Sequence, residues 1–119
     1  MAAIREQIEK CLHLCFIVTP YEPSVAVAEK LKAVAPGKFA KKTFIVNTGA
    51  EAVENSIKIA RDYTERTAVI CFNEAFHGAP LLAMSLTSKT NPYKAGFAPF
   101  VNNIYRFLTP TATGVQRCS

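Results

Sequence analysis

The first third of the chain carries apolar residues at helical spacing. One stripe recurs every three or four residues, at Ile4, Ile8, Leu12 and Cys15. It predicts an amphipathic helix over residues 2–13. A second stripe, followed by the stop signal Ala35-Pro36-Gly37, predicts a helix over residues 23–35, with an apolar face formed by Val27, Leu31 and Val34. Pro23 suits the first turn of this second helix.

Three short runs rich in β-branched and aromatic residues predict strands at about residues 43–47, 68–72 and 103–108. The run 68–72 is apolar without alternation, which is typical of a strand covered on both faces. A helical pattern follows the first run, and a short helix over Leu81 to Leu86 and a loop over residues 87–99 follow the second. The sequence therefore predicts an α/β fold with mainly parallel strands.

The helix predicted after Gly49 has two faces. Its buried side is predicted to contain Val53, Ser56, Ile57, Ala60 and Tyr63. Its solvent side is predicted to contain Glu51, Glu54, Lys58, Arg61 and Glu65. Glu54 and Lys58 have the favourable order for an i,i+4 ion pair, so these charges are most simply a solvated face.

The turn between the first predicted strand and this helix carries candidate chemistry. Thr48 and Glu51 have the spacing of a capping box, in which the threonine oxygen accepts from the Glu51 N–H and the carboxylate returns to the cap. The N–H groups of Gly49 and Ala50 are then left at the positive end of the helix dipole. They can bind an anion such as a phosphate, or simply meet water at a well-capped helix start.

Phe76 and His77 follow the second predicted strand. The carboxyl ends of parallel strands meet at one rim of a sheet, so both residues are expected on the rim that holds Gly49. Taken singly, Phe76 is more simply a core aromatic residue and His77 a hydrogen-bonded structural histidine.

Charge and cysteine content exclude several classes of protein. The formal net charge of the 119 residues is +5, but the basic residues are scattered among acids, so no nucleic-acid partner is expected. No apolar run approaches the roughly 18 residues of a membrane span, and no signal peptide is recognised. The cysteines are interpreted as buried thiols of a reducing compartment, the cytoplasm or the mitochondrial matrix, and as no metal site: Cys11, Cys15, Cys71 and Cys118.

Several groups of residues together resemble the cofactor domain of class III aminotransferases, which are pyridoxal 5'-phosphate enzymes of fold type I. The groups are Asn47-Thr48-Gly49-Ala50-Glu51-Ala52-Val53-Glu54-Asn55, Lys58-Ile59-Ala60-Arg61 and Phe76-His77-Gly78. Further groups resemble the 4-aminobutyrate aminotransferase branch: Cys15-Phe16, Pro20-Tyr21-Glu22-Pro23 and Lys41-Lys42-Thr43. The resemblance implies a partial three-layer αβα large domain over residues 1–108. Residues 109–119 are polar, and the sequence predicts a weakly structured tail there.

The resemblance also implies roles for individual residues. The Gly49 and Ala50 amides would bind the cofactor phosphate, Phe76 would stack on the pyridine ring, and His77 would lie beside that ring. The Glu51 carboxylate must then turn back toward the cap, away from the phosphate. Family members usually continue Phe-His-Gly with Arg-Thr, whereas this sequence has Ala79-Pro80, so a changed local loop is expected.

No catalytic residue is assigned. Transamination needs a lysine that binds the cofactor covalently and an acid opposite the pyridine nitrogen. No lysine of this sequence, including Lys89 and Lys94, has a context resembling the family's lysine motif. The sequence is therefore expected to be a fragment of a family member, with strand edges and helix faces left bare.

The parent enzyme implied by the resemblance is a homodimer. It would move an amino group from 4-aminobutyrate or a similar ω-amino acid to a 2-oxo acid such as 2-oxoglutarate, and this chain alone is expected to be inactive. Two alternatives stay open: a non-catalytic binding or regulatory chain that pairs with a full-length aminotransferase subunit, and a phosphate-binding α/β module for another ligand.

Overall fold

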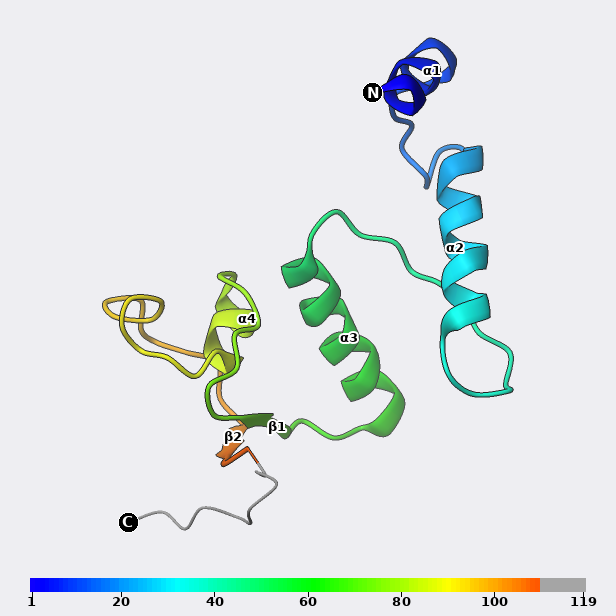
Figure 1. Cartoon of the computed structure of the whole chain (residues 1–119). Helices are drawn as coiled ribbons and strands as arrows, with labels where there is room; N and C mark the ends of the chain where they lie inside the picture. Colours follow the sequence, from blue (N-terminus) through cyan, green and yellow to red (C-terminus); the bar gives the residue numbers. More distant parts are fainter. Residues whose placement is uncertain (110–119) are drawn as a thin grey trace. The chain divides into compact units, whose positions relative to one another are not determined.

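The computed structural model describes residues 1–109 (Figure 1). Along the sequence they divide into two compact units, with the boundary between Ile45 and Val46. The first unit contains α1 (Ala2–Lys10) and α2 (Glu22–Val34). The second unit contains α3 (Gly49–Thr64), β1 (Val69–Phe72), α4 (Leu81–Leu86) and β2 (Ile104–Phe107). Of the predicted tail, only Thr109 is among the described residues, and its hydroxyl donates to the Asn73 carbonyl oxygen at 3.0 Å.

The first helix ends earlier than its apolar pattern predicts. α1 stops at Lys10 rather than at residue 13, and Cys11 has an extended backbone with φ −172° and ψ 125°. Helices in proteins are stabilised mainly by packing of their apolar face, yet Ile4 and Ile8 are 60% and 56% exposed. The last predicted turn therefore has little to stabilise it. α2, in contrast, matches its predicted bounds to within one residue.

The prediction of a strand at residues 43–47 is wrong. Within residues 1–109 the sheet consists of β1 and β2 alone, and residues 43–47 have no strand partner. The segment has the right composition for a strand, but strand structure requires a neighbour that takes up its N–H and C=O groups. Thr43 instead donates through its hydroxyl to the Ala28 carbonyl oxygen at 3.3 Å.

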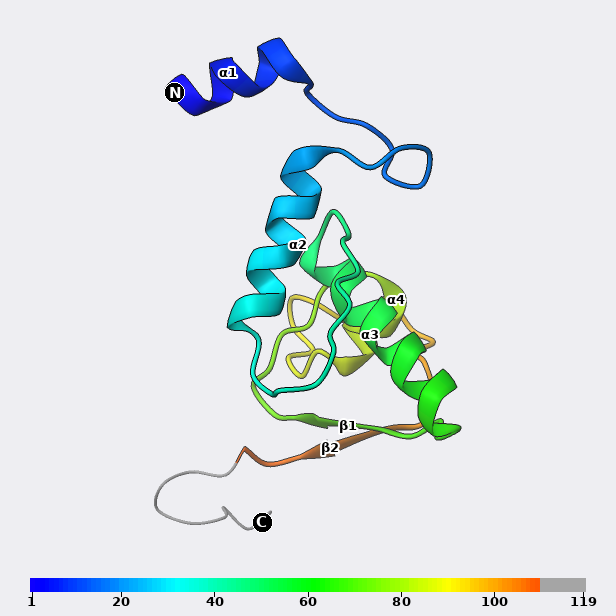
Figure 2. The same ribbon diagram turned by 90° about the vertical axis from the view of Figure 1, so that its right-hand side faces the viewer.

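β1 and β2 lie within one residue of the predicted bounds 68–72 and 103–108, and they pair in parallel as expected. The two strands lie side by side (Figure 2). The register pairs Val69 with Ile104 and Phe72 with Phe107. Cys71 is 4% exposed, whereas its neighbour Ile70 is 64% exposed. In the part of the chain that the structure describes, the sheet is therefore covered on one face only. The prediction that β1 is covered on both faces is wrong.

α3 buries a different set of residues from the one predicted. Val53 and Ile57 are half-buried as expected, but Ser56 and Ala60 are exposed and Tyr63 is 88% exposed. Two residues predicted on the solvent side are half-buried instead: Glu54 and Arg61. The Glu54 carboxylate accepts a hydrogen bond from the Ala83 N–H at 3.2 Å. Contact with α4 therefore determines which face of α3 is buried.

The small core lies around α4, the short helix predicted at Leu81 to Leu86. Ala83, Met84 and Leu86 are buried together with Cys71 of β1. The Arg106 guanidinium of β2 donates from one nitrogen, Nη2, to three carbonyl oxygens at the carboxyl end of this helix, those of Ser85, Leu86 and Thr87, at 2.9, 3.0 and 3.0 Å. A positive group at the end of a helix satisfies carbonyls that have no intrahelical partner.

Of the cysteines, Cys71 is buried as predicted, but Cys11 is only half-buried and Cys15 is exposed. Cys118 lies outside the described residues. Across residues 1–109, no cluster of three His, Cys, Asp or Glu side chains is arranged to hold a metal ion. No helix in this part of the chain has both the length and the apolar character needed to cross a membrane.

Removal of the Arg106 guanidinium should destabilise the second unit. Arg106→Met keeps an unbranched side chain but leaves the three carbonyls without their donor, so the free energy of unfolding should fall by about 1–2 kcal/mol. Urea unfolding followed by circular dichroism measures this change. The control is Arg66→Met, because Arg66 is exposed and its guanidinium donates no hydrogen bond among the described residues. Equal effects of the two variants would contradict the role given to Arg106.

Candidate functional site

The capping box predicted at the start of α3 is present. The Thr48 hydroxyl accepts from the Glu51 N–H at 3.1 Å. The Glu51 carboxylate accepts from the N–H groups of Asn47 at 2.7 Å and Thr48 at 3.1 Å. The negative charge of Glu51 is therefore turned back toward the preceding turn, as expected.

Two backbone donors remain open at this helix terminus. Among the described residues, the N–H groups of Gly49 and Ala50 have no acceptor. A Cβ added to Gly49 would meet no atom within 4 Å, so the space in front of the first turn is open. The positive end of the dipole of a 16-residue helix lies behind these donors. The arrangement can bind an anion by backbone hydrogen bonds.

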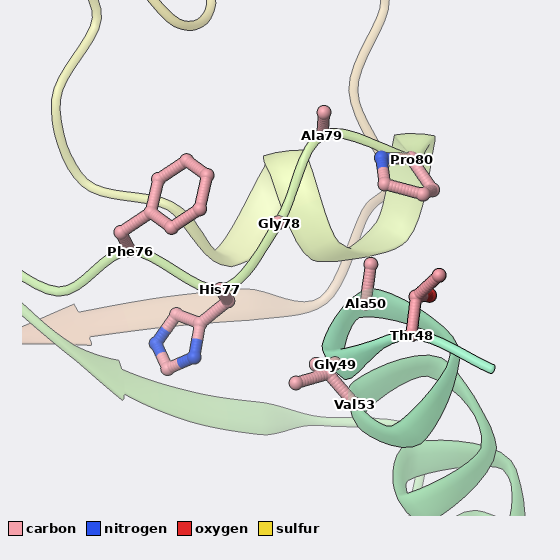
Figure 3. A pocket seen from close by; sticks show the side chains of 9 residues that line it. All are labelled: Thr48, Gly49, Ala50, Val53, Phe76, His77, Gly78, Ala79 and Pro80. Atoms are coloured by element: carbon pink, nitrogen blue, oxygen red, sulfur yellow. The ribbon is translucent and has the colours of Figure 1, made fainter. Parts of the chain in front are cut away.

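The open donors face a hollow of about 590 Å³, which lies between the first turn of α3 and the segment that leads from β1 to α4 (Figure 3). This volume is within the range of small-molecule sites, roughly 300–1,000 Å³. The four residues predicted from the sequence, Gly49, Ala50, Phe76 and His77, all line it. The other lining residues are Thr48, Val53, Gly78, Ala79 and Pro80.

Phe76 and His77 leave opposite sides of this segment (Figure 3). The Phe76 ring is 59% exposed and lies 5.0 Å from the Tyr93 ring, measured between centroids. The His77 backbone N–H donates to the Thr87 hydroxyl at 3.0 Å, which fixes the position of the histidine. Its side-chain Nε2 is buried without a hydrogen-bond partner among residues 1–109. A buried ring nitrogen without a partner is an available donor or acceptor for a ligand.

Gly78 allows the two sides of the hollow to approach each other. Its φ of +131° is unfavourable for residues with a side chain, and a Cβ added there would lie 2.9 Å from the Ala50 Cβ and 3.1 Å from the Ala83 Cβ. Sequence reasoning assigned no role to this glycine, although its place between the Phe76-His77 pair and Pro80 is a signal for a tight turn.

The donor set fits a phosphorylated aromatic ring. Two backbone amides at a helix N-terminus suit a phosphate, an exposed phenyl ring suits an aromatic face, and the unpartnered His77 nitrogen suits a polar group on that ring. No lysine is among the residues that line the hollow. The pKa of Lys94 is lowered, first by burial and then by the positive charge of Arg106, while Cys71 acts in the opposite direction. Lys94 does not line the hollow. Its Nζ instead lies 4.7 Å from the centroid of the Phe100 ring.

Comparisons with known proteins agree with one another. A sequence model of the family described as "Aminotransferase class-III" matches residues 1–117. The 4-aminobutyrate aminotransferase of Mycobacterium leprae (strain TN) is 53% identical over 104 residues, which cover 87% of this chain and 23% of that protein. The 5-aminovalerate aminotransferase DavT of Pseudomonas putida is 46% identical over 111 residues, which cover 93% of this chain and 26% of that protein.

A solved structure titled "Transaminase with L-ala" resembles the fold with a TM-score of 0.77 and 24% sequence identity, over 92% of this chain and 27% of that one. This likeness confirms the expected partial α/β transaminase fold. The chain spans about a quarter of the length of the curated relatives it matches.

Substitution of Gly78 should separate the two sides of the hollow. Gly78→Ala combines an unfavourable φ with contacts below 3.2 Å, so we expect a loss of about 2–3 kcal/mol in the free energy of unfolding. Gly96→Ala is the matched control, because Gly96 has a φ of +83° but no atom within 4 Å of an added Cβ. It should lose only about 1 kcal/mol. Thermal unfolding compares the two variants, and equal losses would contradict the close approach.

Proposed function

Since the chain belongs to the class-III aminotransferase family, we propose that it supplies the phosphate-binding and ring-contacting side of a pyridoxal 5'-phosphate site. The observation that carries this proposal is the shared hollow. Gly49 and Ala50 line it from α3, and Phe76 and His77 line it from the segment after β1. These residues are far apart in the sequence, and each has the chemistry that one part of the cofactor requires.

In this proposal the phosphate binds at the amides of Gly49 and Ala50. A phosphate dianion gains from the helix dipole and from two charge-assisted hydrogen bonds. Repulsion by the nearby Glu51 carboxylate is limited because its oxygen already accepts two backbone hydrogen bonds on the side of the preceding turn. The capping box thus performs two tasks, since it starts the helix and keeps the anion site positive.

Phe76 and His77 orient the ring. The exposed Phe76 ring offers an apolar face that keeps water from one side of an aromatic ligand. Nε2 of His77 offers one hydrogen bond to a polar ring substituent. When bound, pyridoxal 5'-phosphate supplies an electron-withdrawing ring that stabilises a carbanion formed from the amino substrate.

The reaction that we propose for the whole protein is the transfer of an amino group from an ω-amino acid, such as 4-aminobutyrate, to a 2-oxo acid such as 2-oxoglutarate. The names of the two relatives support this choice, because 4-aminobutyrate and 5-aminovalerate both carry the amino group at the end remote from the carboxylate. We propose a homodimer as the active form. This chain covers 23% and 26% of the lengths of these two relatives, and we expect the catalytic groups in the part of the protein outside it.

Binding of pyridoxine 5'-phosphate to the full 119-residue chain tests the proposal. This analogue has the ring and the phosphate but no aldehyde, so it cannot form adducts with surface lysines. Calorimetry should give an affinity at least about tenfold higher for pyridoxine 5'-phosphate than for pyridoxine, because only the former can use the Gly49 and Ala50 amides.

A matched pair of variants locates the phosphate. Gly49→Glu brings a negative charge into the open space before α3 and should weaken binding of pyridoxine 5'-phosphate about tenfold. Gly49→Gln adds a side chain of the same shape without the charge and should change the affinity much less. Equal affinities of wild type and Gly49→Glu, or equal binding of pyridoxine and its phosphate, would refute the proposed site.

A further inference from the structure

Thr87, the residue after α4, has a completely buried side chain, with an exposed fraction of 0%. Its hydroxyl accepts a hydrogen bond from the His77 N–H at 3.0 Å. The same oxygen lies 3.3 Å from the Gly78 carbonyl oxygen and 3.2 Å from the Ala83 carbonyl oxygen. Thr87 does not line the hollow at the start of α3, so it is not among the residues that would touch a ligand there.

The single proton of the Thr87 hydroxyl has two carbonyl oxygens within reach. That of Ala83 already accepts from the Thr87 N–H at 3.0 Å. That of Gly78 has no other donor within residues 1–109. Donation to Gly78 therefore satisfies a carbonyl that otherwise lacks a donor. One hydroxyl then bonds two consecutive residues of the segment between β1 and α4.

Helix α4, which precedes Thr87, is bonded to the elements on both sides of it. The Thr87 carbonyl oxygen accepts from the Arg106 guanidinium of β2 at 3.0 Å. The Glu54 carboxylate of α3 accepts from the Ala83 N–H of α4 at 3.2 Å. Residues 76–80 run beside α4 (Figure 3) and are bonded to it through Thr87. Their position relative to the first turn of α3 is thereby fixed.

Packing alone does not explain a threonine at this position. Valine has almost the same shape and would fill the same space without burying a hydroxyl, which costs free energy unless the hydroxyl is hydrogen-bonded. The hydroxyl adds the contacts to the backbone of His77 and Gly78. His77 carries the buried Nε2 without a partner among the described residues, and Gly78 makes the close approach to Ala50.

We propose that Thr87 is a positioning residue for the ligand site, whose hydroxyl fixes the backbone of His77 and Gly78 so that the His77 ring meets the aromatic ring of the ligand. The inference rests on the proposed function, because it concerns the same hollow. The phosphate-binding amides of Gly49 and Ala50 do not need this hydroxyl, since the capping box holds their turn. Loss of the hydroxyl should therefore impair recognition of the ring but not of the phosphate.

The ratio of two affinities measures recognition of the ring. NMR titration of the ¹⁵N-labelled full chain gives dissociation constants for inorganic phosphate and for pyridoxine 5'-phosphate. In Thr87→Val, which keeps the shape and loses the hydroxyl, the ratio of the first constant to the second should fall about three- to tenfold. The constant for inorganic phosphate should change less than about twofold.

A second pair of variants separates the hydroxyl from packing. Thr87→Ser and Thr87→Ala both remove the buried methyl group, but only Thr87→Ser keeps the hydroxyl. Thr87→Ser should keep the wild-type ratio, whereas Thr87→Ala should lose it by the same factor as Thr87→Val. Exchange of the His77 amide hydrogen should be about tenfold faster in Thr87→Val than in the wild type.

Thr64→Val is the matched control. The Thr64 hydroxyl also donates to the carbonyl oxygen four residues earlier, that of Ala60, at 2.6 Å, and Thr64 does not line the hollow. This variant should leave the ratio unchanged.

The outcomes distinguish this inference from the proposed function. A wild-type ratio in Thr87→Val or Thr87→Ala would overturn the inference and leave the proposed function intact. An equal fall in Thr87→Ser and Thr87→Ala would also overturn it, because packing rather than the hydroxyl would then be responsible. Equal dissociation constants of the wild type for the two ligands would overturn the proposed function, and the inference with it.

Discussion

The close approach of Gly78 to Ala50 is the contact on which the candidate site depends. With a positive φ and no side chain, Gly78 lets the segment after β1 pass against the first turn of α3. The same turn is held by the capping box, which also directs Glu51 away from the hollow. Two elements that are remote in sequence thereby offer backbone donors, an aromatic ring and an unpartnered histidine nitrogen to one volume of space.

The features set by local chemistry could be predicted from the sequence. The capping box needs only Thr48 and Glu51 at the correct spacing, and α2, α4, β1 and β2 follow from stop signals and from short apolar runs. The meeting of Phe76 and His77 with Gly49 is predicted from the rule that parallel strands present their carboxyl ends at one rim. The four residues do share a hollow, but within residues 1–109 no strand precedes Gly49, so the close approach of Gly78 to Ala50 is what brings them together. Each inference uses information contained in neighbouring residues or in the direction of the chain.

Features set by distant partners could not be predicted in this way. Residues 43–47 have strand composition, but residues 1–109 provide no neighbouring strand for them. Tyr63 has the spacing of a buried residue, but no element in this described range covers it. Glu54 and Arg61 were assigned to solvent because they are charged, yet contacts of α3 within the second unit make both half-buried. The exposure of Ile70 and the free edge of β1 have the same cause. The unbroken apolar run at residues 68–72 is typical of a strand inside a larger sheet, whereas the described residues supply only one neighbouring strand, β2.

We propose that the first turn of α3 and the segment after β1 form one ligand site. A two-dimensional ¹H–¹⁵N NMR titration of the full chain with pyridoxine 5'-phosphate tests it most directly. If the two segments share one ligand, the Gly49 and Ala50 amide resonances should move most, and the Phe76 and His77 resonances should move with the same dissociation constant. Shifts confined to one of these two segments, or larger shifts at exposed lysines elsewhere, would contradict it.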